Sequence, residues 1–349
     1  MAAKKATIKD VAALAQVSIK TVSRVINNEP SVGEKTKQRV IDAVDKLDYQ
    51  PNLAARNLAA TRTYALGFVY DNPNAYYIID MQNGILSECR AKGYELVIHP
   101  CKSDSFNIVE ELTNMVRRSQ LAGIIISPPL SENAQLLNAL EQQSIPFVRV
   151  ISKGDETPSA APCVMIDDRT AAFKITEHLI KTGHRNIGFL KGDASHMSSQ
   201  QRELGFMDAL NKHDIKCTSD YLIEGQFTFE FGTKGVNQLL DLSQRPTAIF
   251  ACNDEIAAGA LFAARLRGVN IPDQLAIAGF ENSPFSRQTY PKITTAAQPT
   301  DEIAKLATAC LIQHIKSDMV YVASSHESTT FTPELIVRES TYIASTGDA

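Results

Sequence analysis

The stretch that most constrains this chain is residues 7–28, TIKDVAALAQVSIKTVSRVINN. Thr7 can begin a helix, and Asp10 three residues later completes a capping-box pattern. The helical spacing of apolar residues, which places Val11, Leu14 and Ala15 on one face, breaks at residues 16–17. Ser18 is a favourable N-cap for a second helix over residues 19–26. The pattern predicts two short helices joined by a tight turn.

The second of these helices has two contrasting faces. Val22, Val25 and Ile26 form an inner apolar face, while the opposite face carries hydroxyls, amides and positive charge without an acid. Such a face suits the DNA major groove, where hydroxyls and Lys meet phosphates and Arg meets guanine edges. The alternative is a packed helical hairpin with a solvated face. The candidate DNA contacts in this segment are Thr7, Ser18, Ile19, Lys20, Thr21, Ser23, Arg24 and Asn27.

The segment VSIKTVSRVIN resembles the turn and recognition helix of the LacI/GalR family of bacterial transcription regulators. A third amphipathic helix is expected over residues 34–47, which would complete a three-helix head. The resemblance implies that residues 51–62 hold a hinge helix, which orders on DNA and pairs with its symmetry mate in the minor groove. Asn52 would cap it, Ala55 would permit close approach of the two helices, and Leu58 would wedge between base steps. A plain linker is the alternative.

Composition bounds the class of protein. The chain has 349 residues with 44% hydrophobic and 21% charged side chains, which is ordinary for globular material of two or three domains. No apolar run is long enough to span a bilayer, the N-terminus does not read as a signal peptide, and the six scattered cysteines suggest reduced thiols. We therefore expect a cytoplasmic bacterial protein without membrane contact.

The charge is unevenly distributed. The whole chain carries −4, but residues 1–62 hold eleven Lys and Arg against six Asp and Glu, a balance of +5 that leaves −9 for the remainder. A basic head on an acidic body fits a localised DNA footprint. Chance asymmetry is the alternative.

From residue 64 onward, short apolar runs alternate with longer amphipathic ones, which predicts parallel sheets covered on both faces. Strands are expected near residues 65–70, 95–99, 123–127, 147–151, 163–166, 186–190, 221–224, 248–252, 275–280 and 294–297. Helices are expected near residues 78–92, 108–119, 171–182, 201–213, 230–242 and 255–267.

Three motifs in this region strengthen the resemblance: CNDEIAAG at residues 252–259, HLIKTGHRNI at 178–187, and GFEN at 279–282 followed by PKITT at 291–295 and QP at 298–299. The resemblance implies an α/β fold, in which a helix-turn-helix head (1–50) and a hinge helix (51–62) precede a periplasmic-binding-protein-like body (63–349). Two doubly wound parallel-sheet subdomains would form the body, one from residues 63–161 and 297–320 and the other from 162–292 and 325–345. Crossovers are expected near 160–162, 291–298 and 317–325.

A ligand in such a body would lie beyond the carboxyl ends of the strands. The candidate effector contacts at those ends, or at positions that the resemblance supplies, are Asp71, Tyr77, Ser127, Arg202, Phe227, Asn253 and Glu281. Carboxylates and amides beside aromatic rings suit a sugar, although Tyr77 and Phe227 could instead be core residues. The family usually has Asp where this chain has Glu281.

Other polar residues in the body receive different interpretations. Many sugar-binding members have an Asp near the end of the fourth strand, which this chain lacks, so Arg149, Ser152 or Asp71 are the alternatives there. Asp254 is interpreted as a helix cap, and His178 and His184 as packed, hydrogen-bonded residues. Asp167 and Asp168 form no visible acid–base set.

The sequence therefore predicts a homodimeric, DNA-binding transcriptional repressor that a small sugar releases from operator DNA. A dimer is favoured because the last residues show no heptad pattern. A purine-responsive or corepressor-dependent regulator of the same family is the first alternative, and a sugar-binding transport protein is a second. An enzyme is not expected, since no catalytic, phosphate-binding or metal-binding motif is visible, and no cofactor is expected.

Overall fold

The structure is a computed structural model that describes residues 6–26, 32–49, 63–317 and 329–341. It forms two compact units, a head of residues 1–64 and a body of residues 65–349. The candidate contacts Asn27, Asn52, Ala55 and Leu58, and with them the expected hinge helix, lie outside the described residues.

The head contains the three predicted helices: α1 (Ile8–Ala15), α2 (Ile19–Ile26) and α3 (Glu34–Lys46). The carboxylate of Asp10 accepts a hydrogen bond of 2.8 Å from the backbone N–H of Thr7, as the capping box requires. Gln16 ends α1 in the left-handed conformation with φ 52°, and the Ser18 hydroxyl accepts a hydrogen bond from the backbone N–H of Thr21 at 3.1 Å. The predicted caps and turn are confirmed.

The inner face of α1 differs from the expectation at one position. Leu14 is 43% exposed, whereas Ala12 is buried beside Val11 and Ala15. Ile8 also packs against this core. The buried stripe therefore runs through residues 8, 11, 12 and 15, which is the i, i+3, i+4, i+7 spacing of one helix face, and Leu14 falls outside it.

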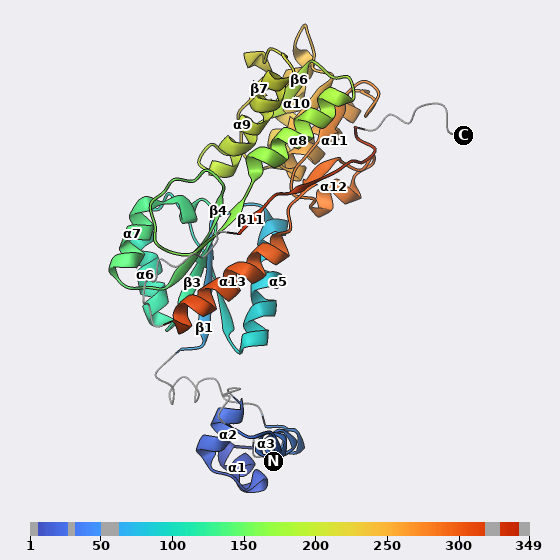
Figure 1. Cartoon of the computed structure of the whole chain (residues 1–349). Coiled ribbons are helices and arrows are strands. Elements are labelled where there is room, and N and C mark those ends of the chain that lie inside the picture. Colours follow the sequence, from blue (N-terminus) through green and yellow to red (C-terminus); the bar gives the residue numbers. More distant parts are fainter. Residues whose placement is uncertain (1–5, 27–31, 50–62, 318–328, 342–349) are drawn as a thin grey trace, which may run out of the picture. The chain divides into compact units, whose positions relative to one another are not determined.

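The first subdomain of the body is built on a six-stranded parallel sheet. In spatial order its strands are β11 (Thr330–Phe331), β5 (Cys163–Ile166), β4 (Phe147–Ser152), β3 (Gly123–Ile126), β1 (Ala65–Tyr70) and β2 (Glu95–Pro100). Helices α5 (Ala75–Lys92) and α13 (Thr300–Lys316) lie together on one face, and α6 (Ile108–Arg118) and α7 (Ala134–Gln142) lie on the other (Figure 1). Both faces of the sheet are covered, as the near-continuous apolar strands predict.

The second subdomain is built on a four-stranded parallel sheet. Its order is β7 (Leu222–Ile223), β6 (Ile187–Leu190), β8 (Ala248–Ala251) and β9 (Ala276–Ala278). Helix α8 (Asp168–Lys181) packs beside α9 (Met197–Lys212), and α10 (Phe229–Asp241) packs beside α11 (Asp254–Leu266).

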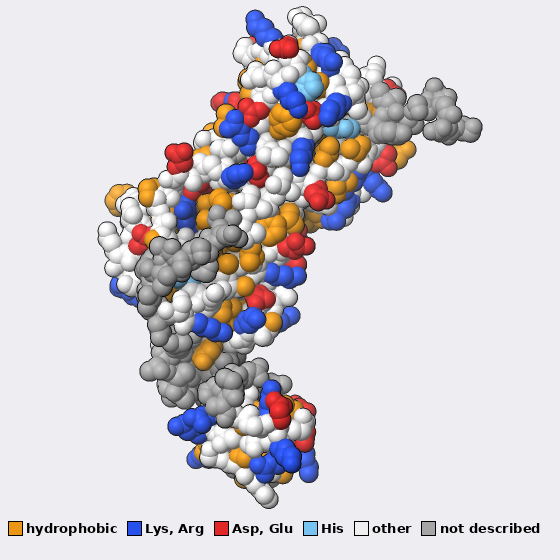
Figure 2. All heavy atoms as spheres, in the orientation of Figure 1, with side chains coloured by type: hydrophobic (Ala, Val, Ile, Leu, Met, Phe, Trp, Pro, Cys, Tyr) orange, Lys and Arg blue, Asp and Glu red, His pale blue; other side chains and the backbone are white. Residues whose placement is uncertain are grey.

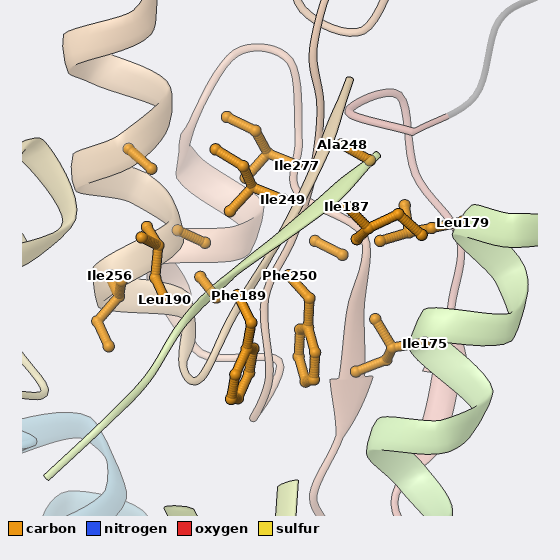
Figure 3. Packing of buried hydrophobic residues seen from close by; sticks show 14 of the residues in the cluster. Ile175, Leu179, Ile187, Phe189, Leu190, Ala248, Ile249, Phe250, Ile256 and Ile277 are labelled. Carbon is orange, nitrogen blue, oxygen red and sulfur yellow. The ribbon is translucent and has the colours of Figure 1, made fainter. Parts of the chain in front are cut away.

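The core of the second subdomain lies on both sides of its central strands. Figure 3 shows Ile175 of α8 and Ile256 of α11 on opposite sides of the sheet, with Phe189 and Phe250 between them. The ring centroids of Phe189 and Phe250 are 5.0 Å apart, and Phe189 also stacks on Phe206. These three rings are fully buried and supply much of the apolar area that stabilises the subdomain.

Three connections join the subdomains, and two of the expected boundaries are corrected. β5 and β11 both belong to the first sheet. The first passage therefore occurs between β5 and α8, at residues 166–168, rather than near 160–162. The last passage lies between β11 and β12, rather than near 317–325. The other two passages flank a short antiparallel pair, β10 (Thr295–Ala297) with β12 (Glu334–Ile336). Sheet membership depends on long-range pairing, which the local pattern of a four-residue or two-residue strand does not specify.

Candidate functional site

A cleft between the two subdomains, at the carboxyl ends of the strands, encloses a cavity of about 40 Å³. The first subdomain lines it with Asn72, Asn74, Tyr77, Pro128, Ser152 and Ile166. The second subdomain lines it with Asp168, His196, Ser198, Arg202, Phe227 and Glu281, and Gln298 adds a side chain from the segment that returns to the first. A cavity of this size holds a few water molecules, so the described conformation is nearly closed.

A buried ion pair forms the polar centre of the cleft. Arg202 on α9 and Asp168 at the start of α8 are 4% and 1% exposed, and Arg202 Nε donates to Asp168 Oδ1 at 2.9 Å. Arg202 Nη1 donates to the carbonyl of Cys252 at 2.7 Å, and the Ser152 hydroxyl donates to Asp168 Oδ2 at 2.6 Å. The guanidinium carbon lies 3.7 Å from the centre of the Phe280 ring. Arg202 is held on several sides, as a buried guanidinium must be.

The charges of this pair influence each other. Burial raises the pKa of Asp168, and the neighbouring Arg202 acts against that rise. Burial would lower the pKa of Arg202, but Asp168 holds it above its ordinary value. The arginine is therefore a permanent cation that the protein itself compensates.

Glu281 provides a second carboxylate and occupies an unusual backbone conformation. Its φ of 102° lies in the left-handed region that favours glycine, so the chain is strained where this side chain enters the cleft. Its Oε2 accepts a hydrogen bond from the Asn74 amide of the first subdomain, and its Oε1 is 3.9 Å from Arg202 Nη1. Burial raises the pKa of Glu281 to about 8. Glu281 thus connects the two subdomains across the cleft.

A second carboxylate contact crosses the interface. Glu132 ends the 3₁₀ turn η1 (Leu130–Glu132), and its Oε2 accepts a hydrogen bond of 3.1 Å from the backbone N–H of Met197, the first residue of α9. Burial raises the pKa of Glu132 to about 7. Because an exposed helix N-terminus favours an anion, this contact ties η1 to α9 in the closed conformation.

Aromatic rings lie at two sides of the cavity. Phe227 is 6% exposed and belongs to the core of the second subdomain, but its ring also lines the cleft and meets His196 edge-on at 5.3 Å. Tyr77 lies in the first turn of α5, which Asn74 caps by accepting from the backbone N–H groups of Tyr76 and Tyr77. Burial raises the pKa of the Tyr77 phenol. Phe227 is therefore both a core residue of the second subdomain and part of the cleft lining.

The structure brings together four of the seven candidate effector residues: Tyr77, Arg202, Phe227 and Glu281. The other three do not line the described cavity. Asp71 accepts from the backbone N–H and hydroxyl of Ser103, Asn253 caps α11 by accepting from Ile256 N–H at 2.9 Å, and Ser127 is fully buried.

The interpretation of Asp254 as a helix cap is wrong, because Asn253 is the N-cap of α11. The carboxylate of Asp254 instead accepts from the Thr295 hydroxyl at 2.6 Å and from the Ser283 backbone N–H at 2.7 Å. Asp254 therefore holds the segment after β9 against β10. His178 and His184 are hydrogen-bonded to Thr341 and Thr247, as expected of packed histidines.

Sequence reasoning missed the main acidic residue of the cleft. Asp168 supplies a carboxylate in the cleft beside Ser152, at the end of the fourth strand, where the family's usual Asp is missing. Ser152 lines the cleft beside it, whereas Arg149 is buried in an ion pair with Asp155. The signal was present, because Asp168 follows the strand 163–166 at its carboxyl end. The pairing with Arg202, 34 residues away, was not visible.

The outer face of α2 is open on the head. Ile19 and Lys20 are exposed, Thr21, Ser23 and Arg24 are partly exposed, and the hydroxyls of Ser18 and Thr21 are 2.9 Å apart. Figure 2 shows several Lys and Arg side chains on the visible face of the head. The helix presents hydroxyl and cationic groups together, as groove recognition requires.

Within the described ranges, no group of three or more His, Cys, Asp or Glu side chains is arranged to hold a metal ion. A search of the same residues finds no helix with the length and apolar character needed to cross a membrane.

The head has a helix-turn-helix, and the body has two subdomains with a polar, aromatic-lined cleft. Together they are typical of the class of proteins that recognise DNA and bind a small ligand. Comparison with known families gives the same result: residues 7–52 match the model of the bacterial regulatory proteins of the lacI family, and residues 176–341 match the periplasmic binding protein-like domain. The chain belongs to the lacI family of bacterial regulatory proteins.

Similar proteins support this assignment over nearly the whole chain. Catabolite control protein A of Priestia megaterium is 31% identical over 315 residues, covering 90% of this chain and 94% of that protein. The ribose operon repressor of Haemophilus influenzae is 31% identical over 337 residues, covering 97% and 99%. The regulator CelR in complex with cellobiose has a TM-score of 0.71 at 26% identity, covering 96% and 99%. The lac repressor dimer bound to operator and the anti-inducer ONPF shares the fold, with a TM-score of 0.77 at 24% identity, covering 97% and 100%.

Proposed function

We propose that this protein is a cytoplasmic, homodimeric repressor that binds operator DNA through its head and is released by a small sugar bound in the cleft. The observation that carries the proposal is the outer face of α2, where Lys20, Thr21 and Arg24 are presented on a helix-turn-helix. The similar proteins include the ribose operon repressor of Haemophilus influenzae and the transcriptional regulator CelR, which was solved in complex with cellobiose. The same comparison supports a non-enzymatic role.

In this proposal each head reads one half-site of a pseudo-palindromic operator. Lys20, Thr21 and Arg24 contact bases and phosphates, and Thr7, Ser18, Ile19 and Ser23 support the docking. Asn27 extends the reading helix, while Asn52, Ala55 and Leu58 form the hinge segment that enters the minor groove. Residues 1–50, 51–62 and 63–349 are then the DNA-binding, hinge and effector-binding parts.

The dimer is proposed to form along an apolar face of the body. α11 exposes Phe262 and Leu266 at 50% and 73%, and Tyr290, which follows α12 (Pro284–Gln288), is 82% exposed. These side chains surround a groove of about 530 Å³. Ile79 of α5 is 47% exposed, and α5 meets α12 through Tyr76 and Phe285, whose rings are 5.5 Å apart. An exposed apolar surface that continues across both subdomains favours self-association.

The effector would act by its different affinity for two arrangements of the body. Tyr77, Arg202, Phe227 and Glu281 would contact it, with Asp168 orienting Arg202. Asp71 and Asn253, expected as contacts from the sequence, are proposed to support the cleft walls through their own hydrogen bonds, and Ser127, also expected as a contact, through its packing.

The experiment is selection of the bound duplex from a random DNA library, followed by titration at several salt concentrations. Specific binding should weaken steeply with salt, because phosphate contacts release counterions. Arg24→Ala should relax base preference, and Lys20→Ala should lower affinity. Lys46→Ala, an exposed lysine on α3, serves as the matched control and should change affinity little. Recovery of no enriched sequence, or equal effects of the three substitutions, would contradict the proposed reading helix.

A further inference from the structure

The charged side chains that line the described cavity include acids and a single arginine. Arg202 is the one Lys or Arg among the residues that line the described cavity, and Asp168 and Glu281 are both within 4 Å of its guanidinium. His196 adds no positive charge near neutral pH, because burial lowers the pKa of its ring. A bound anion would therefore find no uncompensated cation, because the guanidinium is already paired with the Asp168 carboxylate.

The hydrogen-bonding groups point to the same conclusion. Arg202 Nε and Nη1 already donate to Asp168 and to the Cys252 carbonyl, and the Ser152 hydroxyl is also committed to Asp168. By contrast, Gln298 Oε1 is a buried acceptor with no hydrogen-bond partner in the described part of the chain. The amide nitrogen of Gln298 contacts the Thr300 hydroxyl at 3.3 Å. The groups left open toward a ligand thus include an amide oxygen, which can only accept hydrogen bonds.

We infer that the cleft selects an uncharged, polyhydroxylated ring and rejects sugar acids and sugar phosphates. This inference rests on the proposed effector cleft and narrows its ligand. Hydroxyl groups can donate to Gln298 Oε1 while the faces of the ring pack against Phe227 and Tyr77. A carboxylate or phosphate offers no hydrogen to the Gln298 oxygen, and it would bring a buried charge without a partner.

The test is calorimetric titration of the full-length protein near neutral pH with matched pairs of compounds. The pairs are glucose with glucuronate, galactose with galacturonate, and ribose with ribose 5-phosphate. For at least one pair, the uncharged sugar should bind about a hundredfold more tightly than its anionic partner, as expected when a buried charge is left unpaired. Any anionic compound that binds as tightly as its uncharged partner overturns the inference. Binding of no uncharged sugar in the panel overturns it as well.

A variant tests the cause of the selectivity. Asp168→Asn keeps the side-chain shape but leaves Arg202 uncompensated, so it should improve binding of the anionic partner relative to the uncharged sugar by about tenfold or more. Asp208→Asn removes a carboxylate from the exposed pair with Arg169 and serves as the matched control. Unchanged selectivity in a folded Asp168→Asn protein contradicts the charge argument. The wild-type titrations stand if that variant fails to fold.

These outcomes are separable from the proposed function. The DNA-library selection needs no ligand, so it tests the head independently of the cleft. A protein that binds an operator and responds only to an anionic sugar would retain the regulatory function and lose this inference.

Discussion

At the residue scale, two Arg–Asp ion pairs of the second subdomain differ in burial, and burial decides how much each contributes to stability. Arg202 and Asp168 are almost fully buried and belong to a network that includes Ser152 and the Cys252 carbonyl. Arg169 and Asp208 form a pair of 2.6 Å on the surface, where their side chains are 48% and 40% exposed. Solvent screens the second pair but not the first.

Removing the arginine from each pair should therefore have different consequences. Arg202→Ala leaves Asp168 buried without its cation, and we expect the free energy of unfolding to fall by about 3–5 kcal/mol. Arg169→Ala should cost less than about 1 kcal/mol. Urea unfolding of both variants measures the contrast. Equal losses would show that the buried pair contributes no more than a surface pair.

Buried carboxylates also predict a pH dependence of stability. Burial raises the pKa of Glu281 to about 8 and that of Glu132 and Asp254 to about 7. In the unfolded chain these groups ionise near pH 4.5 or below, so between there and about pH 8 the folded state binds more protons. The stability that they contribute is therefore present at low pH and is lost as pH rises through the folded pKa values.

The melting temperature of the body should accordingly fall between about pH 7 and pH 8.5, and Glu281→Gln should reduce that fall. This interval avoids the titration of His178, His184 and His196, whose pKa values are lowered by burial. Scanning calorimetry of the wild type and the variant at both pH values provides the measurement. A steeper fall in the variant would contradict the assigned direction.

At the element scale, α10 and α11 approach each other closely because each has a glycine at the crossing. A Cβ on Gly259 would lie 2.1 Å from the Phe229 carbonyl oxygen, and a Cβ on Gly232 would lie 2.1 Å from the Ile256 carbonyl oxygen. Gly235 faces the sheet instead, where a Cβ would lie 2.7 Å from the terminal methyl Cδ2 of Leu190. Backbone atoms cannot move aside as a leucine methyl can.

We therefore expect Gly259→Ala to destabilise the body by about 1–3 kcal/mol, and Gly235→Ala to be markedly milder. The two substitutions make the same chemical change near the same helix pair, so helix propensity cancels in the comparison. Denaturant unfolding of the two variants measures the difference. If Gly235→Ala proves the more damaging, the helix crossing is not the constraint that the structure indicates.

Helices and strands could be predicted where short-range interactions along the chain form them, but their arrangement in sheets depends on residues far apart in the sequence. The helices of the head were predicted because caps such as Asp10 and Ser18 act within one turn. The strands of the body were predicted from apolar runs, but the membership of β5 and β11 in the first sheet depends on partners far along the chain. In the cleft, aromatic and arginine positions were predictable from resemblance. Asp168 was missed because its role depends on Arg202.

At the scale of the whole molecule, the exposed apolar residues of α11 and of the segment after α12 indicate where two copies could associate. Phe262 is half exposed beside Leu266 and Tyr290, whereas Phe106 is 99% exposed on the segment between β2 and α6. An isolated exposed ring needs no partner, but a group of rings around a groove is typical of an interface.

Phe262→Glu should therefore shift the protein from dimer to monomer and weaken operator binding at least tenfold, because two linked heads bind with a local-concentration advantage. Phe106→Glu makes the same change at an exposed ring outside the groove and should preserve the dimer. Sedimentation velocity and operator titration give both readouts. A dimer that persists in Phe262→Glu would place the interface elsewhere.

The three passages between the subdomains have a mechanical consequence. The chain crosses at residues 166–168, beside β10 and between β11 and β12, so any relative movement must bend all three segments together. Three connections restrict relative movement more than a single linker would, so we expect the subdomains to rotate about an axis near these segments. A ligand held between the subdomains would then select one angle of that rotation.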